Sequence, residues 1–232
     1  MRVIVVKHHA IDDAGFIADA FAARGAELSV HEFPAGGALP ALDGVDHVII
    51  LGAIWSVYED GISGWIGAEL DWIRAADAAG IPVLGVCFGA QALTAALGGQ
   101  VERAPRLEVG WTTVDTLDAD LVDEGPWFEF HGDLCVPPPH ARVLARNEVC
   151  VQAFSVGPHL AVQFHPEVDA VQLTRWLDDD VVRAEAEQAR QDPGKLIAQT
   201  EAEEPQSAAR ADRLVATAFR LAAAPSMDCD QV

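Results

Sequence analysis

A chain of 232 residues is long enough for one domain, or for one domain with an appendage. Half of its residues are apolar and six are tryptophans, so it can bury a sizeable core. Its formal net charge of −21 gives a surface that repels phosphate backbones and anionic membranes, which argues against nucleic acid or a membrane as a partner.

The N-terminal residues and the cysteines indicate a cytoplasmic protein with reduced thiols. The chain enters an apolar strand directly, without the charged and apolar regions of a signal peptide. No apolar run reaches the ~18 residues of a membrane helix. The four cysteines form no Cys-x-x-Cys pair, so the spacing of a metal site is absent and we expect neither a metal nor a cofactor.

The first hundred residues alternate between short apolar runs and amphipathic segments. We predict strands over residues 2–6, 27–33 and 46–51, and helices over 11–24 and 62–79. A further strand from Ile81 leads through Cys87 into a helix that reaches Leu97. This order predicts the α/β class, with a doubly wound, mostly parallel sheet whose site lies beyond the carboxyl ends of the strands.

From Val101 onward the pattern changes to short, alternating runs bounded by turns, typical of a small antiparallel extension. The expected strands lie at 107–117, 127–130, 142–145, 149–154 and 160–164. The rest is predicted to be helical, over 169–178, 179–191, 193–203 and 207–224, with a break at Pro205 and a frayed tail over 226–232. We therefore expect a domain over residues 1–178 and a helical C-terminal extension over 179–232, packed on or beside it.

Cys87 has the sequence surroundings of a nucleophile. Gly85 and Gly89 stand two residues to either side, where a sharp strand-to-helix turn brings other backbone close. The turn also places the sulfur at a helix N-terminus, which favours the thiolate. The alternative is a buried structural cysteine at a tight turn, and the two glycines argue against it.

A catalytic thiol needs a base, and the base needs an orienting group. His165 ends an apolar strand and precedes Pro166, which disfavours helix at His165 and leaves the imidazole at the strand end. Glu167 can curl back to the far ring nitrogen. His8 and His9 follow the first strand and could also lie near the site, although histidines in loops usually have no such role.

Two of these segments together resemble the triad signature of the class I glutamine amidotransferases: residues 85–91 (GVCFGAQ) and 162–167 (VQFHPE). The loop over 51–58 resembles the family's glycine-rich oxyanion loop. The segments 108–111 (EVGW) and 130–133 (FHGD), together with the helical tail, resemble the stand-alone, GMP-synthase-like branch. The resemblance covers essentially the whole chain and implies the flavodoxin-like fold of that family.

The resemblance also implies a mechanism. Cys87 would attack the side-chain amide of L-glutamine and form a thioester, while His165 would protonate the departing ammonia and then activate water. Glu167 would fix the imidazole. The oxyanion would be held by the backbone N–H of Phe88 and by one from the loop at Gly52 and Ala53.

Substrate contacts are implied at two further places. Gln91 would help to hold glutamine, and backbone near Gly110 and Trp111 would receive its α-amino-acid end. His131 and Asp133 would either contact the substrate or stabilise a turn. No synthetase domain follows in the sequence, so the ammonia is expected to serve a separate synthetase.

The oxyanion loop departs from the family pattern. The family usually has Gly-Gly-Pro where this chain has Gly52-Ala53-Ile54. Ala53 is expected to restrict rotation of the peptide that must aim its N–H, and the loop is expected to be less rigid because it lacks a proline at position 54. Two alternatives therefore stay open: a γ-glutamyl hydrolase acting on another γ-glutamyl amide, and a catalytically weak or silent regulatory subunit. The sequence indicates neither the ammonia acceptor nor the oligomeric state.

Overall fold

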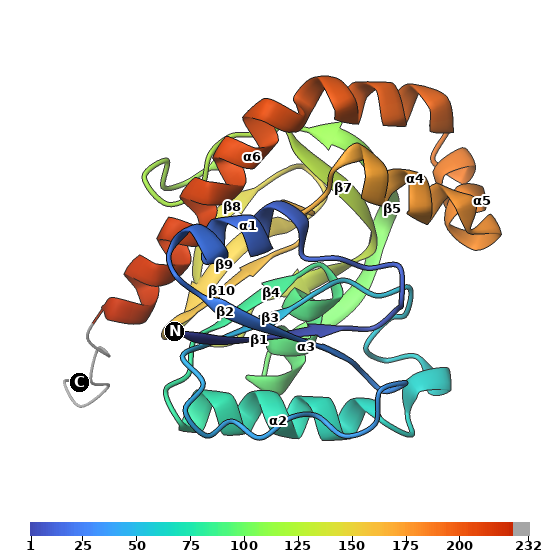
Figure 1. The fold of residues 1–232 in the computed structure, drawn as a ribbon. Coiled ribbons are helices and arrows are strands. Elements are labelled where there is room, and N and C mark those ends of the chain that lie inside the picture. The colour runs from blue at the N-terminus through green and yellow to red at the C-terminus, as the bar shows by residue number, and fades with distance from the viewer. Residues whose placement is uncertain (225–232) are drawn as a thin grey trace.

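The structure is a computed structural model that describes residues 1–224. Its main element is an eight-stranded sheet with the order β2-β1-β3-β4-β10-β9-β8-β6, beside a two-stranded sheet of β5 and β7 (Figure 1). The strands are β1 Arg2–Lys7, β2 Glu27–Glu32, β3 His47–Ile50, β4 Val83–Val86, β5 Gln100–Thr112, β6 Asp115–Thr116, β7 Trp127–Val136, β8 Arg142–Arg146, β9 Val151–Val156 and β10 His159–Val162. The helices are α1 Gly15–Ala23, η1 Asp60–Ile62, α2 Ile66–Ala78, α3 Phe88–Ala96, α4 Ala170–Asp178, α5 Asp180–Gln188 and α6 Pro193–Ala223.

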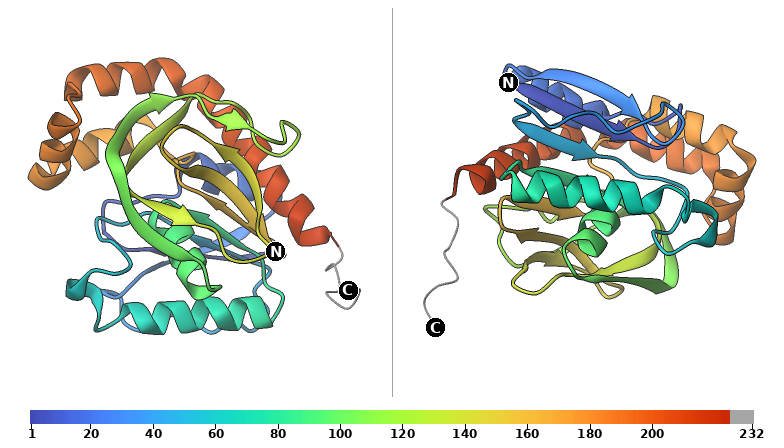
Figure 2. Two further views of the ribbon diagram at one scale, coloured as in Figure 1. Left: turned by 180° about the vertical axis from the view of Figure 1, so that it is seen from behind. Right: turned by 90° about the horizontal axis from the view of Figure 1, so that it is seen from below.

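The large sheet is covered on both faces, as its apolar central strands require. Strands β2, β1, β3, β4 and β10 are parallel, whereas β9, β8 and β6 continue the sheet antiparallel. Along β1, Val3 and Val5 pack with α1 and α6, while Ile4 and Val6 pack with α2 and α3. Figures 1 and 2 show α6 and α2 on opposite sides of the sheet. The predicted α/β class and doubly wound sheet with an antiparallel extension are confirmed.

The second sheet carries the largest differences from the predicted strands. The strand expected over 107–117 is instead β5, which begins at Gln100, followed by the short β6. The pairing of β5 with β7 is interrupted between Arg103 and Glu108. This bulge bends the strand, which blurs the alternating pattern in the sequence.

The predicted break at Pro205 is wrong, because α6 continues through it from Pro193 to Ala223. A proline inside a helix removes one hydrogen bond and costs about 3 kcal/mol. Here residues on both sides are buried, among them Thr200, Ala211 and Leu214, and that packing offsets the cost. The domain boundary at residue 178 stays a prediction, and the tail predicted over 226–232 lies outside the described residues. No helix among residues 1–224 is both long and apolar enough to cross a membrane.

Candidate active site

Cys87 is the single residue between β4 and α3, and its backbone is strained. Its φ of 52° and ψ of −108° lie outside the regions that L-residues ordinarily adopt. Its N–H donates to the carbonyl of Val162, 2.8 Å away, which anchors the turn to β10. The thiol therefore stands at the end of the parallel sheet and at the N-terminus of α3, as the sequence pattern predicts.

The two flanking glycines are required by close backbone approach. A Cβ atom on Gly85 would lie 2.6 Å from the carbonyl oxygen of Gly89. One on Gly89 would lie 2.1 Å from the carbonyl oxygen of Ile50 on β3. The turn can therefore exist only without side chains at these positions, as the sequence pattern predicts.

His165 and Glu167 form a buried pair just beyond β10. The Nδ1 atom of His165 lies 2.7 Å from a carboxylate oxygen of Glu167, and the N–H of His165 donates to the carbonyl of Phe128. Burial lowers the pKa of His165, but the charges of Glu167 and Cys87 outweigh it and raise that pKa well above its usual value. The arrangement favours the protonated form of the His165 imidazole.

These groups meet at one cavity of about 350 Å³. A Cβ atom on Gly52 would lie 3.1 Å from the His165 ring and 3.7 Å from Cβ of Cys87, so three strand ends converge there. The predicted site residues that line the cavity are Cys87, His165, Glu167, Gly52, Ala53, Gln91, His131 and Asp133. Phe88 is fully buried beside them, in the core cluster that also holds α2.

Gly110 and Trp111 do not line the cavity, and a role for backbone near them in receiving the substrate stays a prediction. The bulge in β5 turns residues 103–107 toward the cavity instead. Beyond the bulge the strand faces α6, where the indole N–H of Trp111 donates to Thr200 and Gly110 lies against Leu196.

The loop after β3 is held at both of its ends. At the first end, the carbonyl of Gly52 lies 3.1 Å from Nδ1 of the buried His8. At the other end, Tyr58 donates a hydrogen bond of 2.7 Å to the carboxylate of Asp133, and Ser56 donates to the same carboxylate. Asp133 thus lies in β7 rather than in a turn, and its side chain holds the loop.

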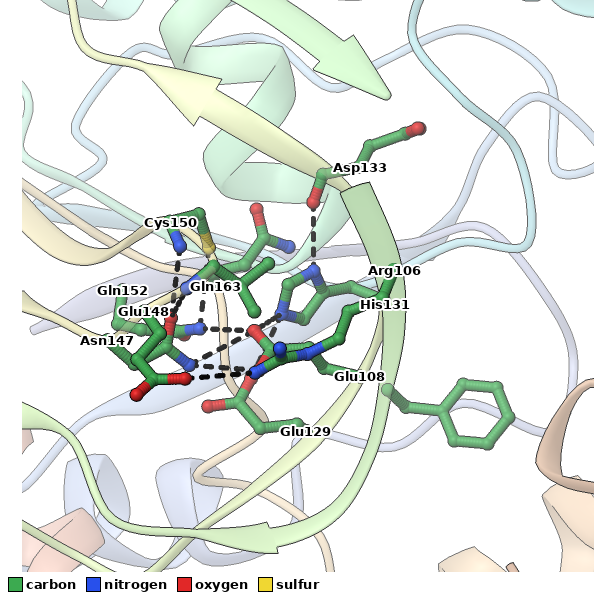
Figure 3. Close-up of polar contacts among 12 residues, drawn as sticks. Arg106, Glu108, Glu129, His131, Asp133, Asn147, Glu148, Cys150, Gln152 and Gln163 are labelled. Atoms are coloured by element: carbon green, nitrogen blue, oxygen red, sulfur yellow. Dashed lines mark hydrogen bonds and ion pairs between the residues drawn. The ribbon is translucent and has the colours of Figure 1, made fainter. Parts of the chain in front are cut away.

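His131 belongs to a buried polar cluster behind the cavity (Figure 3). Its Nε2 atom lies 3.3 Å from Glu108 and 3.2 Å from Glu129, while Nδ1 lies 2.8 Å from the carbonyl oxygen of Asp133. Burial lowers the pKa of His131, but pairing with the two glutamates raises it to about 10. Asn147 and Gln152 donate to the carboxylate of Glu108. The cluster therefore holds a charged imidazole that supports the cavity-lining segment 130–133.

Three side chains of this cluster are spaced closely enough to hold a metal ion, and they are the one such group among residues 1–224. Ligand atoms of Glu108, His131 and Cys150 lie within 4.8 Å of one another. However, burial raises the pKa of the Cys150 thiol far above its usual value, and Glu108 already accepts hydrogen bonds from amides. We therefore describe the set as a polar cluster that binds a proton.

Several residues of the site are missing from the sequence-based prediction. Glu69, Ser56 and Tyr58 contact residues far away in sequence, so no local pattern reveals these contacts. Glu129 lies only two residues from its partner His131, but the pair gives no recognisable motif. Helices α4 and α5 also reach the cavity, with Trp176, Val182, Glu185 and Gln188. His8 and His9, which the sequence places close to the site, both lie near the cavity. His9 lines it, and His8 contacts the Gly52 carbonyl from behind it.

Comparison with known proteins fits this geometry. Residues 13–184 match the family model described as glutamine amidotransferase class-I. The chain belongs to that family. A solved glutamine amidotransferase from Thermotoga maritima is 28% identical to this chain. The two structures superpose with a TM-score of 0.84, and the match covers 97% of this chain and 99% of the other.

Two curated relatives of this amidotransferase-family chain carry the name GMP synthase. One, from Sulfolobus acidocaldarius, is named as a single subunit of the glutamine-hydrolyzing enzyme; it is 35% identical over 133 residues, which is 53% of this chain and 68% of the relative. The other, the glutamine-hydrolyzing enzyme from Aeropyrum pernix, is 31% identical over 205 residues, 82% of this chain. The chain spans only 38% of that longer relative.

Proposed function

We propose that the chain hydrolyses the side-chain amide of L-glutamine to glutamate and ammonia. The observation that supports this most directly is the strained Cys87 in one cavity with the hydrogen-bonded pair of His165 and Glu167. A poised thiolate, a base and an orienting carboxylate are the groups that nucleophilic amide cleavage needs.

In this mechanism the Cys87 thiolate attacks the carboxamide carbon and a C–S bond forms. The developing oxyanion accepts hydrogen bonds from the backbone N–H groups of Phe88 and Ala53. His165 gives its proton to the amide nitrogen, the C–N bond breaks and ammonia leaves. His165 then takes a proton from water, which attacks the thioester, and the C–S bond breaks to release glutamate. Glu167 keeps the imidazole oriented throughout.

Glutamine would lie between α3 and the segment 130–133. Gln91 is buried one turn after the nucleophile, and its amide oxygen has no hydrogen-bond partner among the described residues. A buried amide oxygen without a partner is costly, so a donor from the substrate would satisfy it. The side chains of His131 and Asp133 are already engaged by Glu108, Glu129 and Tyr58, so in this proposal they shape the cavity wall beside the substrate.

A separate synthetase would consume the ammonia. The Sulfolobus relative is named as one subunit of a glutamine-hydrolyzing GMP synthase, and the match covers 68% of that subunit. We therefore propose that the chain works as the amidotransferase component of a two-component system.

A second candidate is hydrolysis of a larger γ-glutamyl amide. One observation favours it: the cavity extends past the triad to Val182, Glu185 and Gln188 of α5. A leaving group larger than ammonia could occupy that end. The chemistry at Cys87 would be the same.

The test is a glutaminase assay of the wild type, Cys87→Ala and Cys135→Ala, with and without a candidate synthetase. Cys135 is a matched control, because burial raises the pKa of its thiol to about 12. We expect Cys87→Ala to abolish ammonia release and Cys135→Ala to retain it. Equal turnover by Cys87→Ala and the wild type would overturn the assignment, and faster turnover of γ-glutamyl amines than of glutamine would favour the second candidate.

A further inference from the structure

His8 and Glu69 form a buried pair that touches the oxyanion loop without reaching the cavity. His8 follows β1, and Glu69 projects from α2. The Nε2 atom of His8 lies 3.0 and 3.1 Å from the two carboxylate oxygens of Glu69, and its Nδ1 atom lies 3.1 Å from the carbonyl oxygen of Gly52. Both side chains are fully buried. His8 does not line the cavity, so it can act on the reaction only through its neighbours, which are the Gly52 carbonyl and the ring of Phe88, 4.7 Å away between ring centroids.

The order of the strands fixes the direction of this contact. His8 follows β1, Gly52 follows β3 and Cys87 follows β4, and β3 lies between the other two strands. The carbonyl of Gly52 therefore points toward the β1 side of its own strand. In a trans peptide the C=O and the following N–H point in opposite directions. The N–H of Ala53 consequently points toward the β4 side, where Cys87 stands.

We propose that His8 and Glu69 are positioning residues that aim the Ala53 N–H at the oxyanion. Glu69 holds the imidazole through Nε2, and His8 holds the Gly52 carbonyl through Nδ1. The inference rests on the proposed amide hydrolysis, since it assigns a role to the loop in that reaction.

The sequence of the loop explains why such a device is needed. The loop has Ala53 and Ile54 where the family usually has glycine and proline, so the second glycine and the proline that would shape the loop are absent. Among residues 1–224, the non-glycine residues at positive φ are Cys87, His140 and Arg190. Ala53 thus keeps an ordinary backbone conformation, and the peptide before it is fixed from outside by His8.

The principal test compares His8→Ala with His159→Ala. His159 is a matched control, because it is equally buried, pairs with Asp77 through Nε2 and contacts the backbone of Val83 through Nδ1, away from the cavity. We expect His8→Ala to lower kcat for glutamine about 100-fold, as loss of an oxyanion donor does, with little change in KM. Alkylation of Cys87 by iodoacetamide forms no oxyanion and should keep its wild-type rate. His159→Ala should keep its kcat.

Two further variants guard against a simple folding defect. The double variant His8→Phe, Glu69→Leu replaces the pair by apolar groups of similar size, which often leaves stability intact, and should lose kcat like His8→Ala. His8→Asn places an amide donor near the Nδ1 position and should recover most of the loss. An unchanged kcat in the double variant, or a parallel fall in kcat and iodoacetamide labelling, would overturn the proposal.

Crystal structures separate this inference from the proposed function. If the wild type releases no ammonia from glutamine, the proposed function fails on that result alone. Structures of the wild type and of the double variant then decide the inference. We expect the Gly52 carbonyl to turn away from its wild-type direction in the variant. The same peptide orientation in both structures would overturn the role of His8 and Glu69.

Discussion

The two sides of the cavity are built in different ways. The turn at Cys87 is made by a short stretch of chain, in which Gly85 and Gly89 allow backbone contacts that a Cβ atom would forbid. The loop facing it, from Gly52 to Tyr58, is held by His8, which follows β1 and pairs with Glu69 of α2, and by Asp133 of β7. The comparison teaches that the turn at the nucleophile is marked by a local glycine pattern, whereas the contacts that hold the oxyanion loop leave no such mark in the sequence.

The largest expected effect comes from breaking the local side. In Gly89→Ala the new Cβ atom would lie 2.1 Å from the carbonyl oxygen of Ile50, which is backbone and cannot move aside cheaply. We expect a loss of about 3 kcal/mol or more in the free energy of unfolding and loss of turnover. Urea unfolding and the glutaminase assay would measure both.

Gly67→Ala is the matched control for that prediction. Gly67 lies in α2, and a Cβ atom added to it would meet no other part of the chain within 4 Å. Alanine there should stabilise the chain by about 0.5–1 kcal/mol. If Gly89→Ala were tolerated as well as Gly67→Ala, the close approach of α3 to β3 would not constrain the turn.

Glu167→Gln tests the base that serves the local side. The charge of Glu167 raises the pKa of His165 against the lowering effect of burial, so its removal should lower that pKa. The imidazolium would then lose its proton at a lower pH than in the wild type. We expect kcat to fall about 10²- to 10⁴-fold. NMR titration of the His165 ring would follow the pKa, and an unchanged pKa would contradict this role.

His131 tests the cluster that supports the cavity wall. Its pKa is raised to about 10 in the folded chain, compared with about 6.5 when unfolded. The folded chain therefore holds the proton over this range, and the stabilisation is full below the lower value and lost as pH rises through the upper one. As pH rises through that window, the free energy of unfolding should fall by up to ~1.4 kcal/mol per pH unit because of this group.

The measurement is urea unfolding between neutral and alkaline pH for the wild type, His131→Asn and His140→Asn. His140 is exposed and has a φ of 68°, a conformation that asparagine tolerates, so it serves as the control. The slope with pH should become shallower only in His131→Asn. The same slope in all three chains would show that His131 does not carry the proton.

The smallest effect concerns the far end of the oxyanion loop. Burial and the hydrogen bond to Asp133 raise the pKa of the Tyr58 phenol, and Tyr58 is the only tyrosine in the chain. An ultraviolet titration of the phenol should therefore give one transition above the usual pKa, shifted to lower pH in Asp133→Asn. Tyr58→Phe should lower kcat a few-fold, as for a lost hydrogen bond of about 1 kcal/mol. A Tyr58 transition unaffected by Asp133→Asn would disprove the contact.

Sequence patterns predicted the local parts of this site well. The glycine spacing around Cys87 predicted the sharp turn, and the proline after His165 predicted an extended strand end with Glu167 close to the ring. The helix break at Pro205 failed, because burial on both sides of that residue outweighed its local preference. No local pattern revealed the bulge in β5, which places residues 103–107 at the cavity while Gly110 and Trp111 lie outside its lining.

The sequence by itself determined the order of the strands and helices, the sharp turn at Cys87 and the placement of Glu167 beside His165, because each of these depends on neighbours within a few residues. Only the tertiary structure decided what holds the oxyanion loop and the wall opposite it. His8 meets Glu69 across 61 positions of sequence, and Tyr58 meets Asp133 across 75. Contacts over such separations leave no period or motif in the chain, since they exist only once the sheet has brought the ends of its strands together.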